Sequence, residues 1–247
     1  MAKGTARVGS LIAFEGLDGA GKSTQIRRLA DALSADGHPV DIRKLNANRL
    51  FKDQCRRLND RDLLGPVEAA LMKAAELAGR FEAVAMALDH GVVVLWDKYI
   101  VGSIVADIAR SVPLKYTDAL LSTLPEPDLT VYLEITPAEA LRRKNEIGGP
   151  RVMESGLDVT FGARQAHAKM AAGEIDPDTI ARHFLAFQTR MAEAYGRCLP
   201  PERTLRIDAA RSQAEIAESI AEHVRGVLLE RRRDRQVCLG TAGNGHA

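Results

Sequence analysis

The chain has 247 residues, 46% of them hydrophobic and 27% charged, which is enough for one sizeable core, and no apolar run approaches the roughly 20 residues of a bilayer-spanning helix. A formal net charge of +1 and an aromatic content of 4% give no support for a nucleic-acid-binding surface. The cysteines Cys55, Cys198 and Cys238 lie far apart, and residues 1–7 lack a signal-peptide core, so we expect reduced thiols, a cytoplasmic location and no membrane partner.

An apolar run at residues 8–14 predicts a buried strand, and the segment Gly-x-x-x-x-Gly-Lys-Ser follows it from Gly16 to Ser23. Apolar residues at helical spacing then occupy residues 26–33. Strand, glycine loop and helix in this order are the context of a phosphate-binding P-loop, whose backbone N–H groups and helix dipole face a phosphate. We therefore expect Lys22 to neutralise β- and γ-phosphate charge, and the Ser23 hydroxyl to bind Mg²⁺.

The rest of the chain alternates apolar strands with helical patterns. Further strands are predicted at residues 40–44, 92–96, 129–135 and 204–207, and helices at 66–88, 101–110, 115–124, 137–144, 177–198 and 212–229. Thr136-Pro137 and Asp176-Pro177 are expected to start two of these helices as an N-cap followed by proline at the first helical position. Residues 230–247 are basic and then glycine-rich, and they are expected to form a flexible tail, as are residues 1–7.

Such alternation predicts a parallel sheet with helices on both faces and ligands at the carboxyl ends of the strands. Three segments converge at that edge: Gly16–Ser23, Asp97-Lys98-Tyr99 after the third strand, and residues 208–212 after the last.

Several stretches together resemble the thymidylate kinase family, in the order in which the family has them. They are Phe14–Thr24, Asp97-Lys98-Tyr99, Pro127–Pro137 with Ala140–Arg143, the set Phe187, Arg190 and Tyr195, and Ile207-Asp-Ala209. The resemblance covers about residues 8–228 and implies one P-loop NTPase domain. That fold is an α/β three-layer sandwich with a five-stranded parallel sheet and a helical lid, placed here at about residues 142–183.

The resemblance also implies an activity, the transfer of the ATP γ-phosphoryl group to a nucleoside 5′-monophosphate with Mg²⁺, by a homodimer that assembles through helices flanking the sheet. The residues carried over for ATP are Gly16, Asp18, Gly19, Ala20, Gly21, Lys22, Ser23 and Thr24, and those for the metal are Ser23 and Asp97. Phosphoryl transfer needs cations around the moving group. The expected catalytic cations are Lys22, Lys98, Arg142, Arg143 and Arg151. Part of the family uses a P-loop arginine where this chain has Ala20, so the lid arginines are expected to take over its work.

The acceptor side departs from the family. Its expected residues are Asp18, Arg49, Met72, Glu76, Asp97, Lys98 and Ser103. Lys98 replaces an arginine, and Met72 and Glu76 stand where an ungapped alignment puts the phenylalanine and arginine that hold thymine. The Glu-Pro-Gly-Gly segment usual after the second strand is missing, and about thirty residues are inserted near residues 155–182.

Glu76 leads to a hypothesis about the acceptor, because a carboxylate repels the thymine O4 carbonyl. It predicts that dTMP is a poor substrate and that the preferred base offers a hydrogen-bond donor. The alternative is that Glu76 faces solvent.

Other classes of protein remain open at this stage. A deoxynucleoside or other small-molecule kinase is the nearest enzyme, but it usually carries Glu-Arg-Ser where this chain has Asp97-Lys98-Tyr99, which suits an acceptor that already bears phosphate. A GTPase switch is less consistent, because Asp62-Leu-Leu-Gly65 does not follow a strand and Asn-Lys-x-Asp is missing from the sequence. A non-catalytic paralogue conflicts with the intact Lys22-Ser23 pair.

Overall fold

The computed structural model describes residues 8–44, 53, 57–58 and 64–242, with side chains through residue 233. The strands are β1 (Ser10–Gly16), β2 (Val40–Lys44), β3 (Val93–Asp97), β4 (Leu129–Glu134) and β5 (Thr204–Asp208). The helices are α1 (Lys22–Ala35), α3 (Pro66–Ala78), α4 (Phe81–Asp89), α5 (Ile100–Ala109), α6 (Asp118–Leu121), α7 (Pro137–Asn145), α8 (Val152–Ser155), α9 (Leu157–Phe161), α10 (Ala163–Ala171), α11 (Pro177–Cys198) and α12 (Gln213–Ala242). Among the described residues there are also two 3₁₀ turns, η1 (Leu114–Tyr116) and η2 (Pro201–Arg203).

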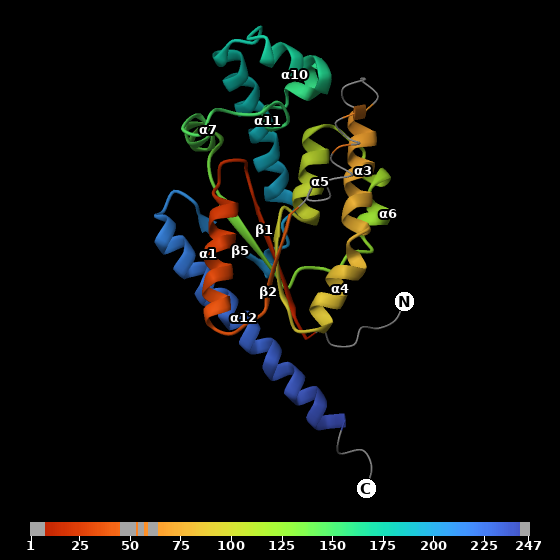
Figure 1. Ribbon diagram of the computed structural model, residues 1–247, viewed down its shortest axis with the longest axis vertical. Helices are drawn as coiled ribbons and strands as arrows, with labels where there is room; N and C mark the ends of the chain where they lie inside the picture. The colour runs from red at the N-terminus through yellow and green to blue at the C-terminus, as the bar shows by residue number, and fades with distance from the viewer. Residues whose placement is uncertain (1–7, 45–52, 54–56, 59–63, 243–247) are drawn as a thin grey trace.

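The strands form one parallel sheet in the order β2-β3-β1-β4-β5, which confirms the predicted five-stranded sheet. The first strand lies at the centre, where Ile12 is paired with Leu95 of β3 and with Leu129 of β4. Because every strand points the same way, all the carboxyl ends lie at one edge of the sheet. Figure 1 shows the helices of the lid, α7 and α10, beyond this edge.

Helices cover both faces of the sheet, as predicted, because successive side chains of a strand point to opposite faces. Ile12 and Phe14 of β1 pack in a core shared with α1, α11 and α12, whereas Leu11 and Ala13 pack in a second core with α3, α4 and α6. In Figure 1, α1 and α12 accordingly lie on one side of the sheet, and α3, α4 and α6 lie on the other.

The inserted region forms a small helical unit of its own. Buried Val152, Leu157, Ala166 and Ile175 form a separate core among α8, α9, α10 and the start of α11. Gly156 joins α8 to α9 at φ 71°, and a Cβ atom at this position would lie 2.7 Å from the Phe187 ring. Only glycine fits this turn, and because it has no side chain the backbone at residue 156 can pack directly on Phe187 of α11.

The helix starts at Thr136 and Asp176 are as predicted: each side chain accepts a hydrogen bond from the backbone N–H three residues later, and proline follows it. The single helix expected over residues 66–88 is two helices instead, because the chain breaks at Gly79-Arg80 between α3 and α4. Glycine has little helix propensity. The helix expected at 115–124 is the short η1 and α6.

The last helix continues to Ala242, whereas a flexible tail is expected from residue 230. Residues 230–236 contain neither glycine nor proline and consist mostly of good helix formers. Arg231 also ties this part of α12 to the body through an ion pair with Asp128 and a 3.2 Å hydrogen bond to the Gly9 carbonyl.

Candidate active site

The P-loop connects β1 to α1 at the carboxyl edge of the sheet. Gly19 and Gly21 adopt φ values of 100° and 94°, and a Cβ atom on Gly19 would lie 2.9 Å from the Ala140 carbonyl of α7. Glycine therefore allows both the turn and the close approach of the lid helix. The Lys22 ammonium is buried and donates hydrogen bonds of 2.8 Å to the carbonyls of Gly16 and Leu17.

The electrostatics of Lys22 follow from its position. Burial, with the nearby charge of Lys98 acting in the same direction, lowers the pKa of Lys22 to about 8. The carboxylates of Asp18, Asp97 and Glu15 oppose this shift. In the free protein the pKa of Lys22 thus lies not far above neutral pH. The negative charge of bound phosphates would raise this pKa again.

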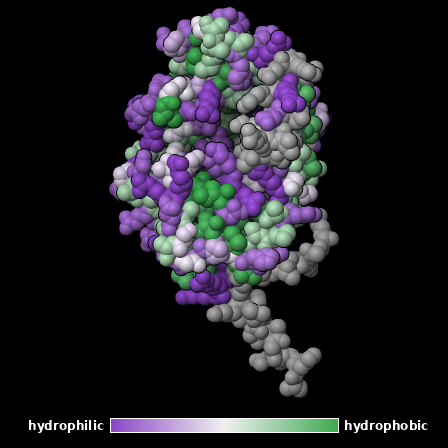
Figure 2. Space-filling view, in the orientation of Figure 1, coloured by the Kyte–Doolittle hydropathy of each residue, from purple (hydrophilic) through white to green (hydrophobic). Residues whose placement is uncertain are grey.

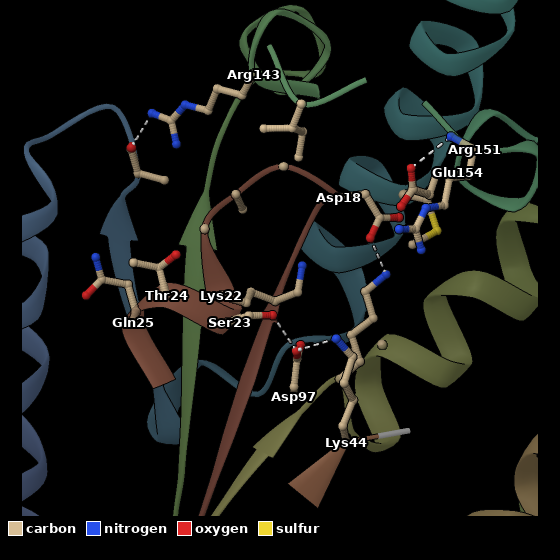
Figure 3. Close-up of a pocket in the computed structure, with 18 of the residues that line it drawn as sticks. Asp18, Lys22, Ser23, Thr24, Gln25, Lys44, Asp97, Arg143, Arg151 and Glu154 are labelled. Atoms are coloured by element: carbon tan, nitrogen blue, oxygen red, sulfur yellow. Dashed lines mark hydrogen bonds and ion pairs between the residues drawn. The ribbon is translucent and has the colours of Figure 1, made fainter. Parts of the chain in front are cut away.

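Ser23 and Asp97 are brought together, as expected of a metal-binding pair. The Ser23 hydroxyl donates to Asp97 Oδ2 at 2.9 Å, and Lys44 Nζ lies 3.4 Å from the same oxygen atom. Figure 3 shows both side chains pointing to this carboxylate from opposite sides. Lys44 is the last residue of β2, and the sequence analysis does not include it among the site residues. Its position at the carboxyl end of a predicted strand could have indicated a place in the site.

Asp18 and Lys98 form an ion pair with 2.7 Å between Lys98 Nζ and Asp18 Oδ1. Burial alone would raise the pKa of Asp18, but the charges of Lys98 and Lys22 hold it well below its usual range. Burial would likewise lower the pKa of Lys98, but the Asp18 carboxylate raises it. Both groups are therefore charged at neutral pH, and they join the loop after β3 to the P-loop.

The Glu15 carboxylate holds the Asp97-Lys98-Tyr99 segment in place through hydrogen bonds at and just after its end. Lys98 has a left-handed φ of 58°, which is uncommon for a residue with a side chain. Just beyond it, the fully buried Glu15 carboxylate accepts hydrogen bonds from the N–H groups of Tyr99 (2.9 Å) and Gly102 (3.0 Å), and from the Tyr195 hydroxyl (3.0 Å). Burial raises the pKa of Glu15, while these three hydrogen bonds oppose the shift.

The lid arginines Arg142, Arg143 and Arg151 all line the cavity. Arg142 is exposed and forms ion pairs with Glu139 and Glu146 on its own helix. Arg143 pairs with Glu139 and donates a 2.7 Å hydrogen bond to the Ala209 carbonyl, next to the end of β5. Figure 3 shows Arg143 on the opposite side of the cavity from Arg151.

Gln188 connects the lid to the P-loop, whereas Lys144 pairs within the lid, and neither contact is predicted from the sequence. The Lys144 ammonium lies 2.7 Å from Glu154 Oε2, and Arg151 donates its backbone N–H to the same oxygen at 3.0 Å. The fully buried Gln188 side chain donates to the Glu154 carbonyl at 2.8 Å and accepts from the Asp18 N–H at 3.4 Å.

A cavity of about 800 Å³ is lined by Asp18, Lys22, Ser23, Lys44, Asp97 and Lys98 together with the lid arginines. It extends from Arg143, Ala209 and Arg211 at one end to Lys73, Ala106 and Arg110 at the other. Figure 2 shows hydrophilic side chains mixed with hydrophobic ones on the upper part of this face, where the lid lies. A space of this size with cations along its length suits two phosphate-bearing ligands.

The acceptor end differs from the expectation. Among the described residues, Met72, Glu76 and Ser103 do not line the cavity, whereas Lys73 does. Glu76 is buried and forms an ion pair with Arg80, one helical turn further along α3. The structure thus gives no support to the expected contact between Glu76 and the acceptor base, which stays a prediction. Arg49 lies outside the described residues.

Neither a membrane-spanning helix nor a preformed metal cluster is seen in the part of the chain that the structure describes. No described helix is long and apolar enough to cross a bilayer. Nor do three or more His, Cys, Asp or Glu side chains gather into a metal site among these residues.

The parallel sheet, the strand–loop–helix phosphate site and the cationic lid define a P-loop phosphotransferase. The family model described as thymidylate kinase matches residues 14–173, more than half of the chain, and the chain belongs to this family. It is a nucleoside monophosphate kinase, which takes its phosphoryl group from ATP.

Curated relatives agree with the family match. The chain is 30% identical to a thymidylate kinase of Nitratidesulfovibrio vulgaris, over 88% of this chain and 96% of the relative. It is 28% identical to a probable thymidylate kinase 2 of Saccharolobus solfataricus, over 87% of this chain and 97% of the relative. It is 29% identical to a thymidylate kinase of Halothermothrix orenii, over 90% of this chain and 99% of the relative.

Proposed function

We propose that ATP occupies the P-loop end of the cavity, and that the monophosphate lies between Lys98 and the wall formed by α3 and α5. The observation that carries this assignment is the Lys98–Asp18 ion pair, which holds a cation beside the P-loop on the acceptor side. A neutral 5′-hydroxyl acceptor would need a base at this point, whereas a phosphate needs a cation. The arrangement therefore favours a nucleoside 5′-monophosphate over a nucleoside.

In the reaction, an oxygen of the acceptor phosphate bonds to the γ-phosphorus atom as the bond between that phosphorus and the β–γ bridging oxygen breaks, which leaves ADP and a nucleoside diphosphate. Lys22 lies beside the β- and γ-phosphates, and Lys98 beside the acceptor phosphate. Both reduce the repulsion between the two anions. The lid arginines Arg142, Arg143 and Arg151 supply the charge that Ala20 cannot, because they line the same cavity.

Mg²⁺ fits the pair of Ser23 and Asp97. Their oxygen atoms, 2.9 Å apart at the phosphate end of the cavity, are hard ligands of the kind that this ion prefers. Mg²⁺ usually keeps several waters and takes one or two protein oxygens together with substrate phosphates, so a larger cluster of acidic residues is not required. When bound, it neutralises phosphate charge. Asp97 also holds Ser23 and Lys44 in place by accepting from one and pairing with the other.

The kinase domain is proposed to comprise residues 8–228. We propose that it assembles as a homodimer, as the family usually does. We also propose a cytoplasmic location, which is supported by three cysteines that are not spaced as disulfide pairs. Size-exclusion chromatography with light scattering tests the dimer, since the mass of one chain is 26.8 kDa.

A product assay tests the proposed function. ATP is supplied with deoxynucleosides or with their 5′-monophosphates, and nucleoside diphosphates are separated by ion-exchange chromatography. We expect diphosphates only from the monophosphates, and a loss of at least about a hundred-fold in Lys22→Ala with unchanged circular dichroism. The matched control is Lys115→Ala, which removes an exposed lysine outside the cavity. Monophosphate formation from nucleosides, or full activity of Lys22→Ala, contradicts the assignment.

A further inference from the structure

The inserted unit, which comprises helices α8, α9 and α10, is held to the body of the molecule by a buried ion pair. Arg110 stands at the end of α5, and its Nε donates to Asp158 Oδ2 of α9 at 3.0 Å. The two side chains are only 12% and 8% exposed. Among the described residues, Asp158 Oδ1 has no hydrogen-bond partner, so the buried carboxylate depends on Arg110 for compensation of its charge.

Further hydrogen bonds join the same unit to α5 and to the P-loop. A terminal nitrogen of Arg110 donates to the Met153 carbonyl of α8 at 2.9 Å. On α11, the fully buried Gln188 side chain donates to the Glu154 carbonyl of α8 at 2.8 Å and accepts from the Asp18 N–H of the P-loop at 3.4 Å. The short helix α8 is thus connected both to the acceptor side of the cavity and to the phosphate loop.

Phe187 of α11 lies between these two connections. The guanidinium carbon of Arg110 is 4.7 Å from the centre of its ring, and Gly156 packs so closely on the ring that only a residue without a side chain fits. Phe187 belongs to the main core, and α11 packs against both α5 and α8. The inserted unit therefore shares a rigid helix with the body and does not depend on the ion pair alone.

Arg151 is the cavity residue that this arrangement fixes. It directly precedes α8, and its backbone N–H donates to Glu154 Oε2 at 3.0 Å, as Figure 3 shows. The same oxygen atom lies 2.7 Å from Lys144 Nζ of α7. Because α8 is joined to α5 and to the P-loop, the backbone that carries the Arg151 side chain is held in one place relative to the phosphate site.

We propose that the inserted unit is a brace that keeps the lid on the P-loop before any nucleotide binds, and that Asp158 is a positioning residue that acts through Arg110. This rests on the proposed function, since the phosphates on which Arg151 acts are those of that reaction. Each contact joins two groups of the chain directly and needs no ligand to form. Asp158 lies within the insertion expected at about residues 155–182, so the brace belongs to this chain and not to its family in general.

A lid that is already in place changes the affinity for both substrates. When only a fraction of the molecules has the binding-competent lid, the apparent dissociation constant rises by the inverse of that fraction. The brace keeps this fraction close to one. Once both nucleotides are bound, they hold the lid themselves, so a broken brace should raise the KM values and leave kcat nearly unchanged.

The first experiment removes the cation of the pair and then its partner. Arg110→Met leaves the Asp158 carboxylate buried and unpaired in the docked unit, and so favours the open lid, in which water reaches that carboxylate. We expect KM for ATP and for the monophosphate to rise by about ten-fold to a hundred-fold each, with kcat within about three-fold of the wild type. Adding Asp158→Leu removes the unpaired charge and should return both KM values to within about three-fold of the wild type.

This rescue separates a brace from a direct contact, because Arg110 also lines the cavity. In the part of the chain that the structure describes, Asp158 does not line it. If Arg110 acted by touching a substrate, a second change at Asp158 could not restore binding. A double variant that binds no better than Arg110→Met therefore contradicts the proposal, and so does an Arg110→Met variant with wild-type KM values.

Hydrogen exchange followed by mass spectrometry observes the lid without any reaction. In the wild type, peptides from α8 and α9 should be protected in the free protein, and saturating ADP should slow their exchange by no more than about three-fold. In Arg110→Met they should exchange at least about ten-fold faster until ADP is added. Wild-type peptides that become protected only with ADP contradict the brace.

Two further variants complete the test. Glu174→Ala breaks an exposed ion pair with Lys169 inside the inserted unit, and as the matched control it should change neither exchange nor KM. Gln188→Leu cuts the link between Glu154 and the P-loop, and it should speed the exchange of α8 even if Arg110→Met does not fold. If no monophosphate is phosphorylated, the proposed function fails, whereas the exchange measurements still decide on the brace.

Discussion

Lys98 Nζ lies 2.7 Å from Oδ1 of Asp18, so the acceptor-side loop and the P-loop are joined by an ion pair between two half-buried charged groups that line the cavity. A monophosphate that enters beside Lys98 competes with Asp18 for the same ammonium. In the function proposed above, the pair would provide a preformed place for the acceptor phosphate, with Asp18 keeping the cation oriented until the substrate arrives.

The first prediction concerns the acceptor phosphate. Lys98→Met should raise KM for the monophosphate by about ten-fold to a hundred-fold, because a charge-assisted contact is lost, and should change KM for ATP much less. Lys98→Arg keeps the charge, so its KM for the monophosphate should lie between that of Lys98→Met and that of the wild type. Steady-state kinetics with each substrate varied in turn measures both constants. Equal effects on the two constants would mean that Lys98 serves ATP as much as the acceptor.

The second prediction concerns pH. Since the pKa of Lys22 is lowered to about 8 in the free protein, its ammonium loses the proton as the pH rises through that value. Only the charged form attracts the ATP phosphates, so kcat/KM for ATP should fall about ten-fold per pH unit above that pKa. At saturating ATP the bound phosphates hold the proton on Lys22, and kcat should stay level to higher pH. A pH profile of kcat/KM that is flat from pH 7 to 10 contradicts this.

The third prediction separates the lid arginines. Arg142 is exposed, and it pairs with the half-buried Glu139 and the exposed Glu146 on its own helix, so it can turn to the phosphates at modest cost. Arg142→Ala and Arg151→Ala should lower kcat at saturating substrates by about ten-fold or more, because they act on charge that develops in the transition state. Arg143→Ala should mainly raise KM for ATP, because Arg143 also holds the Ala209 carbonyl beside the end of β5.

The control for this series is Arg197→Ala, an exposed arginine near the end of α11 that does not line the cavity. If all three lid variants keep the wild-type kcat, the cations that act in the transition state lie elsewhere, and Lys98 becomes the main candidate.

The sequence was sufficient for the strands and the P-loop because both depend on local patterns. Residues 40–44 were predicted as a strand and form β2 without any shift, and the Gly16–Ser23 loop has its helix where expected. The break at Gly79-Arg80 was missed because a glycine within an apolar helical pattern often leaves the helix intact. The family was predicted from the order of several such motifs, and it is confirmed by the match of residues 14–173 to the thymidylate kinase model.

The acceptor wall could not be predicted in the same way. Lys73 and Asp107 are 34 residues apart, and Arg110 and Asp158 are 48 apart, so nothing local indicates that they pair. Gln188 also acquires its role only when the lid packs on the P-loop, and Lys144 acquires its own when α7 and α8 come together in the lid. An alignment fixes residue numbers along α3 but not the rotation of the helix, which is why Glu76 was expected in the position that Lys73 takes.

The fourth prediction concerns the metal. Asp97→Asn keeps the hydrogen bond to Ser23 but removes the charge, so the concentration of Mg²⁺ needed for half-maximal activity should rise by about ten-fold. Excess Mg²⁺ should restore most of kcat, because the ligand is weakened and not removed. Asp178→Asn changes an exposed residue on α11 and provides the control. The same Mg²⁺ dependence in Asp97→Asn and the wild type would remove Asp97 from the metal site.

The last prediction concerns Glu15, which supports the acceptor loop without touching the substrate. Glu15→Ala leaves the N–H groups of Tyr99 and Gly102 and the Tyr195 hydroxyl without their acceptor, and should lower the free energy of unfolding in urea by roughly 3 kcal/mol or more. Glu15→Gln keeps an acceptor for both N–H groups and should lose much less. Because burial raises the pKa of Glu15, the folded protein binds a proton more readily than the unfolded chain, and wild-type stability from this group falls as the pH rises above the ordinary value of a glutamate. The glutamine variant carries no such proton, so its deficit relative to the wild type should shrink between pH 5 and 8. A deficit that grows with pH would mean that the ionised carboxylate is the better partner for the three donors.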